Sequence, residues 1–137
     1  MTPPERSAVK ARAIERHLSR VEAMLPATRE AFLPMTPESD AVTLHLWQAV
    51  QLAIDLAVAA CAARNLGTPA DYASAFRALR DAGVLDAPLA ERLVRAVGFR
   101  NVVAHGYESL DLGLVWQAAR EGPADLRSLL TALAAGG

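Results

Sequence analysis

One short segment of the chain, residues 99–107, brings four polar side chains together: Arg100, Asn101, His105 and Tyr107. The apolar residues before it recur about every four positions, which predicts a helix whose packing face reaches this segment. A guanidinium on a packing face costs several kcal/mol unless it is paired, hydrated or open to a cleft. We therefore expect a cleft, a partner chain or an anionic ligand beside Arg100.

The types of these residues suit proton transfer next to a phosphate. A histidine titrates near neutral pH and so can act as base or acid, and an arginine offers a planar fork to phosphate oxygens. Asn101 would orient His105 or a backbone group. On an ideal helix Arg100 is rotated about 140° from His105, so the two do not touch within one chain. Two copies facing each other across a two-fold axis would bring both pairs into one groove.

Other chemistries find little support in the sequence. Cys61 is the only cysteine and lies in an apolar stretch, which is typical of a small core residue. The chain has no glycine-rich phosphate loop, no HExxH and no CxxC pair, so we expect neither a metal nor a cofactor. A lone histidine at a helix end is more often a structural cap. Here an arginine, an asparagine and a tyrosine lie in the same short segment, and this combination favours a functional role.

The composition predicts an all-α protein with a single domain over residues 1–137. Leucine and alanine dominate and aromatic residues make up only 5%, which favours helices over sheet. The net charge of -1 produces no overall attraction to nucleic acid, so any RNA contact must come from a local arginine cluster at a dimer cleft. No secretory signal is visible at the N-terminus, so we expect a cytoplasmic protein without membrane contact.

Periodicity and capping residues predict an antiparallel up-down bundle of four main helices with one additional short helix. Thr36 and Asp86 precede helix starts, Thr68 and Pro69 begin the short helix, and Asp71 is its third residue. The expected helices are 5–25, 37–65, 69–82, 86–106 and a last stretch from 110 to 133 that breaks near Gly122-Pro123.

The helix at 37–65 is apolar nearly all round, so it should be the central helix or face a second subunit. A polar track runs along it through His45, Gln48, Gln51 and Asp55. Two interpretations stay open: hydrogen bonds between helices, or support of the active cleft by Gln51 and Asp55. We expect His17, on the first helix, to be exposed.

The segment RNVVAHGY resembles the RNxxxH signature of the HEPN superfamily, and its Arg-x4-His-x-Tyr form is similar to HepT toxins of the HepT/MntA type. The similarity extends over roughly residues 37 to 116, where further residues follow the family's order. These are Gln51, Asp55, Tyr72, Phe76, Leu79, Gly83, Val84, Leu85, Gly98 and Phe99.

This resemblance implies an HEPN-like bundle that acts as the toxin of a type VII toxin-antitoxin system. The implied activity is a metal-independent endoribonuclease with Arg100, Asn101 and His105 at a homodimer cleft. It further implies that an MntA-like minimal nucleotidyltransferase, the antitoxin, silences the toxin by adenylylating Tyr107. Because Gly106 ends the helix, the Tyr107 phenol can project toward the cleft, although a ring packed at the helix end with its hydroxyl in water is the simpler alternative.

Two other functions fit the same sequence. The chain could be a non-catalytic HEPN module that binds nucleotide or scaffolds a nucleotidyltransferase, in which case Arg100 and His105 would bind rather than cleave. It could also be a dimeric helical bundle with a polar seam and no relation to nucleic acid.

Overall fold

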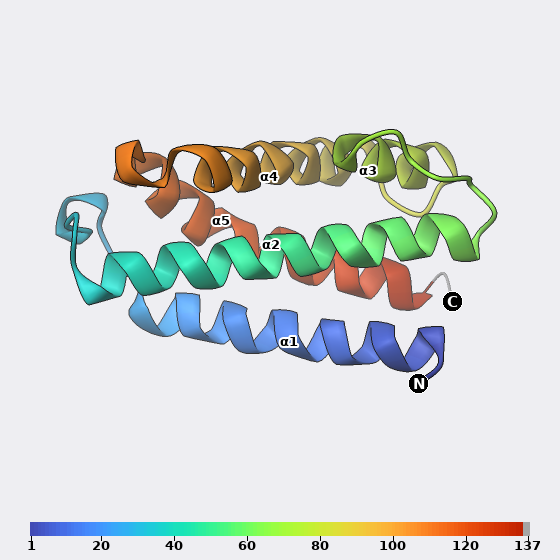
Figure 1. Cartoon of the computed structure of the whole chain (residues 1–137), viewed down its shortest axis with the longest axis horizontal. Coiled ribbons are helices and arrows are strands. Elements are labelled where there is room, and N and C mark those ends of the chain that lie inside the picture. Colours follow the sequence, from blue (N-terminus) through green and yellow to red (C-terminus); the bar gives the residue numbers. More distant parts are fainter. Residues whose placement is uncertain (136–137) are drawn as a thin grey trace.

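The computed structural model describes residues 1–135 and is all-α, as predicted, with no strand in that range. Successive long helices run antiparallel, and the short α3 lies over one end of the bundle beside α4 (Figure 1). The elements are α1 (Pro3–Met24), η1 (Arg29–Ala31), α2 (Pro37–Ala63), α3 (Tyr72–Asp81), α4 (Ala87–Gly106), η2 (Tyr107–Ser109) and α5 (Leu112–Ala135).

Side-chain caps set where the helices begin. The Thr36 hydroxyl accepts from the Ser39 backbone N–H at 3.1 Å and the Asp86 carboxylate from that of Leu89 at 2.8 Å, as predicted. The predicted start of the short helix at Thr68 is wrong. Asp71 is the cap itself rather than the third helical residue, because its carboxylate accepts from the Ser74 backbone, so α3 starts at Tyr72.

The predicted end of α2 and the predicted break in α5 also differ from the structure, and the bounds of α1 and α5 are shifted by one or two residues. Helix α2 stops at Ala63 instead of residue 65, because Asn65 already adopts a left-handed φ of 58°. Helix α5 runs through Pro123 without the predicted break. Pro123 is buried in a continuous packing stripe, and burial on either side of it outweighs the one backbone hydrogen bond that a proline removes. The stripe consists of Val115, Trp116, Ala119, Pro123, Leu126 and Leu129.

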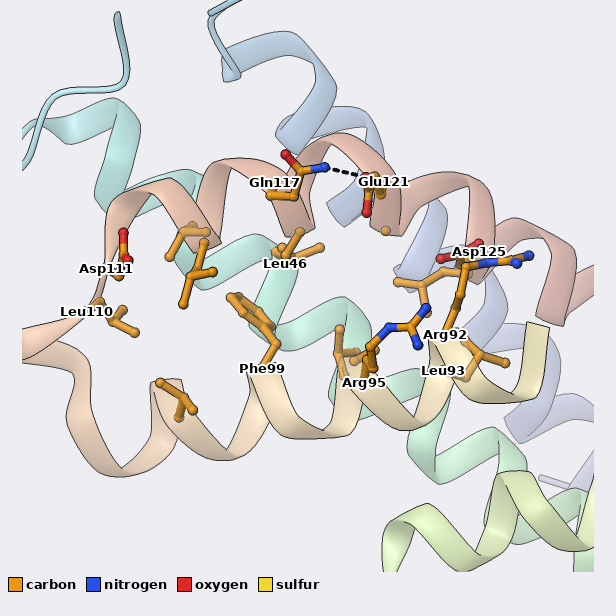
Figure 2. Close-up of a pocket in the computed structure, with 18 residues that line it drawn as sticks. Leu46, Arg92, Leu93, Arg95, Phe99, Leu110, Asp111, Gln117, Glu121 and Asp125 are labelled. Carbon is orange, nitrogen blue, oxygen red and sulfur yellow. Dashed lines mark hydrogen bonds and ion pairs between the residues drawn. The ribbon is translucent and has the colours of Figure 1, made fainter. Parts of the chain in front are cut away.

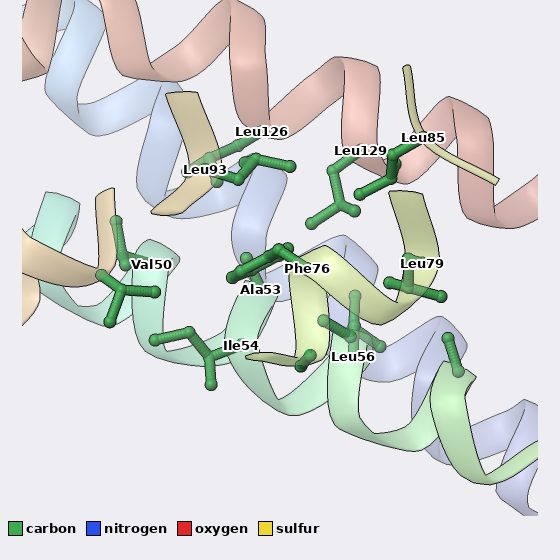
Figure 3. Close-up of a cluster of buried hydrophobic side chains, with 14 of the residues drawn as sticks. Val50, Ala53, Ile54, Leu56, Phe76, Leu79, Leu85, Leu93, Leu126 and Leu129 are labelled. Carbon is green, nitrogen blue, oxygen red and sulfur yellow. The ribbon is translucent and has the colours of Figure 1, made fainter. Parts of the chain in front are cut away.

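Helix α2 is the central helix, as predicted, because it contacts α1, α3, α4 and α5. By length and composition alone it could cross a bilayer, but its packing is that of a core helix. Phe76 of α3 inserts between the long helices and is 2% exposed, next to Ile54 of α2 and Leu93 of α4 (Figure 3). This insertion fixes α3 against the two helices that carry the polar residues.

The expectation that His17 is exposed is wrong. Its ring is half-buried because α1 packs against α2 at this position. The Nδ1 atom of His17 lies 2.9 Å from Nδ1 of His45, on α2. On the other side of α1, the Arg127 guanidinium of α5 forms ion pairs with Glu15 and Glu22, at 3.2 and 2.8 Å. Helix α1 is therefore joined to both of its neighbours by polar contacts outside the core.

Candidate active site

The Arg100 guanidinium is held from several sides near the end of α4. Its Nε donates to Oε1 of Gln51 at 2.8 Å, and its central carbon lies 5.7 Å from the Trp47 ring centre and 5.5 Å from that of Tyr72. Two aromatic faces and an amide oxygen thus compensate a half-buried cation for lost water. Because α2 supplies two of these groups and α3 the third, the packing of three helices fixes the orientation of this arginine.

A chain of polar contacts continues from Arg100 across α2 to α1. The Gln51 amide donates to Oδ1 of Asp55 at 3.2 Å, and the Asp55 carboxylate lies 3.8 Å from the Lys10 ammonium. His45 belongs to a separate contact, with His17. The polar track therefore makes contacts between helices, and Gln51 is the member that reaches Arg100.

Asn101 and His105 are exposed on the outer side of α4. Arg100 donates through Nη1 to Oδ1 of Asn101 at 3.1 Å, whereas Asn101 was expected to orient His105 or a backbone group. Within residues 1–135 no hydrogen bond involves the His105 ring, and none joins it to Arg100. The imidazole is therefore open to solvent or to a second molecule, while the guanidinium is already oriented.

Tyr107 is the first residue of η2, directly after α4 ends at Gly106. Its ring is 47% exposed, but its hydroxyl donates to Oδ1 of Asp40, in the first turn of α2, at 2.9 Å. Burial, and next the hydrogen bond to the Asp40 carboxylate, raise the pKa of the Tyr107 phenol. The phenol thus lies against the start of α2 instead of standing free in water.

Comparison with known proteins extends the similarity of the motif to most of the chain. Residues 14–133 match the family model described as "Ribonuclease HepT-like". The chain belongs to this HepT-like family. The HepT-like chain is also 32% identical over 76 residues to the mRNA nuclease HepT of Shewanella oneidensis. That alignment covers 56% of this chain and 57% of the relative, so the chain spans a little more than half of the relative's length.

Solved structures show the same fold at lower identity. A toxin-antitoxin crystallised with AMP-PNP superposes with a TM-score of 0.84 and 22% identity, covering 94% of this chain and 97% of that one. The tri-AMPylated HEPN toxin of Shewanella oneidensis, in complex with MNT antitoxin, also gives 0.84, at 23% identity with 94% and 96% covered. The HEPN-like bundle predicted from the sequence is thereby confirmed.

Three residues of the HepT-like site were not singled out as site residues from the sequence. Trp47 and Tyr72 contact Arg100, and Asp40 accepts from Tyr107. The spacing on α2 carried a signal, because positions 40, 47 and 51 differ by seven and four residues and so fall on one helix face. What the sequence did not reveal is that this face meets α4.

A separate groove of the HepT-like protein, about 340 Å³, lies between α4 and α5 (Figure 2). Its walls are mainly apolar, and Arg92 of α4 and Asp125 of α5 form an ion pair of 2.8 Å across it. Phe99 lines this groove, whereas Arg100 and His105 do not.

No group of three or more metal-ligating side chains occurs in the part of the chain that the structure describes. The candidate active site lies outside the groove between α4 and α5, with Arg100 packed against α2 and α3 and His105 exposed further along α4.

Proposed function

We propose that this HepT-like protein is the toxin of a type VII HepT/MntA-like toxin-antitoxin system and acts in the cytoplasm as a metal-independent endoribonuclease. Residues 1–137 form the single domain of this toxin. The observation that carries the proposal is the Arg100 guanidinium, which is held by Gln51, Trp47 and Tyr72 on the same helix as the exposed His105 imidazole. Family membership and the similarity to an mRNA nuclease support the same activity.

Each catalytic side chain has a defined task in this mechanism. His105 takes the proton of the RNA 2′-hydroxyl or protonates the leaving 5′-oxygen, since imidazole exchanges protons near neutral pH. Arg100 binds the phosphate oxygens on which charge develops, and Asn101 holds its Nη1. Two chains of a homodimer place both sets in one groove, so that two histidines serve as base and acid.

The test compares RNA cleavage by the wild type with cleavage by Arg100→Ala and His105→Ala. We expect both variants to lose cleavage and to keep their helicity, because neither removes a large buried side chain. Arg95→Ala, an exposed arginine on the same helix, is the matched control and should cleave normally. Wild-type cleavage should persist in EDTA, and its loss there without loss of structure would contradict the metal-independent mechanism.

A wild type without nuclease activity would point to the other function considered from the sequence. If it bound nucleotide, and Arg100→Ala weakened that binding, the chain would be a non-catalytic HEPN module. Growth of cells that express each variant, together with the integrity of their RNA, separates the two functions.

The same proposal includes silencing by an MntA-like nucleotidyltransferase that transfers AMP to Tyr107. The similar structure of a tri-AMPylated HEPN toxin with MNT antitoxin supports this partner. An attached AMP carries a phosphodiester anion that would pair with Arg100 and keep RNA phosphate out. We expect mass spectrometry to map AMP to Tyr107, and Tyr107→Phe to stay folded but escape silencing. AMP found only on other residues would refute this part.

A further inference from the structure

The contact between Tyr107 and Asp40 joins two segments that are far apart in sequence, at the rim of the candidate active site. The phenol donates to the carboxylate at 2.9 Å, and both residues are exposed. Within residues 1–135 no basic side chain lies within ion-pair distance of Asp40, and the Tyr107 hydroxyl is its one side-chain hydrogen-bond partner. The carboxylate is thus directed at a single group, the oxygen proposed above to receive AMP.

Transfer of AMP to a tyrosine requires the loss of the phenol proton. A phenol is un-ionised at neutral pH, and the environment of Tyr107 raises its pKa further. The oxygen is therefore a weak nucleophile unless a base accepts its proton as the new bond forms. A general base must lie within hydrogen-bond reach of that proton, and the Asp40 oxygen already does.

We propose that Asp40 is the general base for nucleotide transfer to Tyr107, so that the toxin itself supplies one catalytic group for its own silencing; this rests on the adenylylation proposed above. Oη of Tyr107 attacks the α-phosphorus of ATP, which the nucleotidyltransferase binds. The bond from oxygen to the α-phosphorus forms, and the bond from that phosphorus to the oxygen bridging to the β-phosphate breaks. Pyrophosphate leaves with the electron pair, while the phenol proton passes to Asp40 and then to water.

The substitution Asp40→Asn separates basicity from position, because the amide oxygen still accepts a hydrogen bond but does not take up the proton. The probe is ATP labelled in its α-phosphate, supplied with the MntA-type enzyme that modifies the wild type. We expect the rate of AMP transfer to fall about 100-fold at neutral pH. That rate should then rise with pH as the phenol ionises by itself, whereas the wild-type rate stays nearly level.

Glu38→Gln provides the matched control. Glu38 lies in the same first turn of α2 and is exposed, so its loss removes one charge from the same helix end. Transfer to this variant should proceed at the wild-type rate. Asp40→Glu, which keeps a carboxylate, should recover part of the activity that Asp40→Asn loses.

A second measurement tests the contact without any partner enzyme. In a Tyr72→Phe background Tyr107 is the only tyrosine, so its ionisation is followed by ultraviolet absorbance. Asp40→Asn should lower the pKa of Tyr107 toward the ordinary value, and no change would show that the contact is absent in solution and overturn the inference.

The outcomes of the transfer experiment are distinct. Transfer to Asp40→Asn at the wild-type rate, or slowed equally at every pH, overturns the role of Asp40 as base but leaves adenylylation intact. A wild type that takes up no AMP overturns the proposed silencing itself. Slow transfer with a new dependence on pH, together with normal transfer to Glu38→Gln, supports Asp40 as the base.

Discussion

At the scale of single residues, the guanidinium of Arg100 is oriented by several neighbours at once. Its Nε donates to Gln51, its Nη1 donates to Asn101, and its central carbon lies 5.7 Å and 5.5 Å from the centres of the Trp47 and Tyr72 rings. Each of these contacts restricts the movement of the Arg100 guanidinium group. The orientation of the guanidinium is therefore set by neighbours on α2, α3 and α4.

The first prediction concerns these neighbours. Gln51→Leu and Tyr72→Leu should each reduce RNA cleavage by about fivefold to tenfold, since each removes a contact with Arg100 that contributes about 1 kcal/mol. The loss should appear in kcat, with RNA binding nearly unchanged, because Arg100 itself remains. Single-turnover cleavage by the two variants and by the control Arg77→Leu, exposed on α3, measures it. Cleavage at the wild-type rate in both variants would show that these contacts are not needed.

The second prediction concerns the His17 and His45 pair. Burial, the His45 ring, and the charges of Arg16 and Arg20 lower the pKa of His17 below 6.5, its ordinary value. The folded state therefore disfavours the protonated ring, and the unfolded chain binds more protons just below that pH. The contribution of the neutral His17 ring to the free energy of unfolding should be fully present above about pH 6.5. It should decrease as the pH falls below that value.

Urea denaturation at several pH values measures this dependence. His17→Gln should weaken it, because no imidazole then has to stay neutral at that position. His105→Ala is the matched control, since His105 is exposed and outside the pair, and it should show the wild-type dependence. An unchanged dependence in His17→Gln would assign the effect to other groups.

At the scale of secondary-structure elements, the short α3 contributes more to the site than its length suggests. Phe76 and Leu79 bury its inner side in the core, which places Tyr72 next to Arg100. The third prediction follows: Phe76→Ala should lower the free energy of unfolding by about 3–5 kcal/mol. Phe76→Leu should cost less, because it leaves a smaller cavity. Thermal and urea unfolding of both variants measure the difference, and equal stability of wild type and Phe76→Ala would contradict the packing shown in Figure 3.

Features that depend on neighbouring residues in the sequence were predictable, whereas features that depend on packing between helices were not. The starts of α2 and α4 were read from Thr36 and Asp86, whose caps involve only the next turn of the chain. The continuation of α5 through Pro123 was not predicted, because it depends on burial against other helices. The residues of the motif were found because they are adjacent in sequence. The contacts of Arg100 with Trp47 and of Tyr107 with Asp40 depend on how α2 aligns with α4, which no local pattern encodes.

At the scale of the whole molecule, one large apolar side chain on the surface of α2 remains uncovered in a single chain. Leu44 is 52% exposed and lies between Asp40 and Trp47 on α2, next to the candidate active site. The fourth prediction is a homodimer at micromolar concentration, since a single bundle leaves Leu44 uncovered and the proposed shared groove needs two copies. Sedimentation equilibrium measures it, and a monomeric wild type would contradict the shared groove.

A pair of variants tests which face forms that dimer. Leu44→Asp should dissociate the dimer and abolish cleavage together. Leu114→Asp places the same charge at a position on α5 that is 65% exposed and lines the groove of Figure 2, and it should leave the dimer intact. Dissociation by Leu114→Asp alone would move the interface to that other face.

The start of α1 and the end of α5 both lie at the end of the bundle opposite the end of α4 (Figure 1). Arg64, just after α2, donates to the Leu133 carbonyl of α5 at 3.4 Å and keeps that end together. A fluorophore or surface anchor joined to either of these two helix ends would therefore sit roughly 35 Å from the Asp40 carboxylate, about the length of α5. Immobilised in this way, every molecule would present the candidate active site to solution.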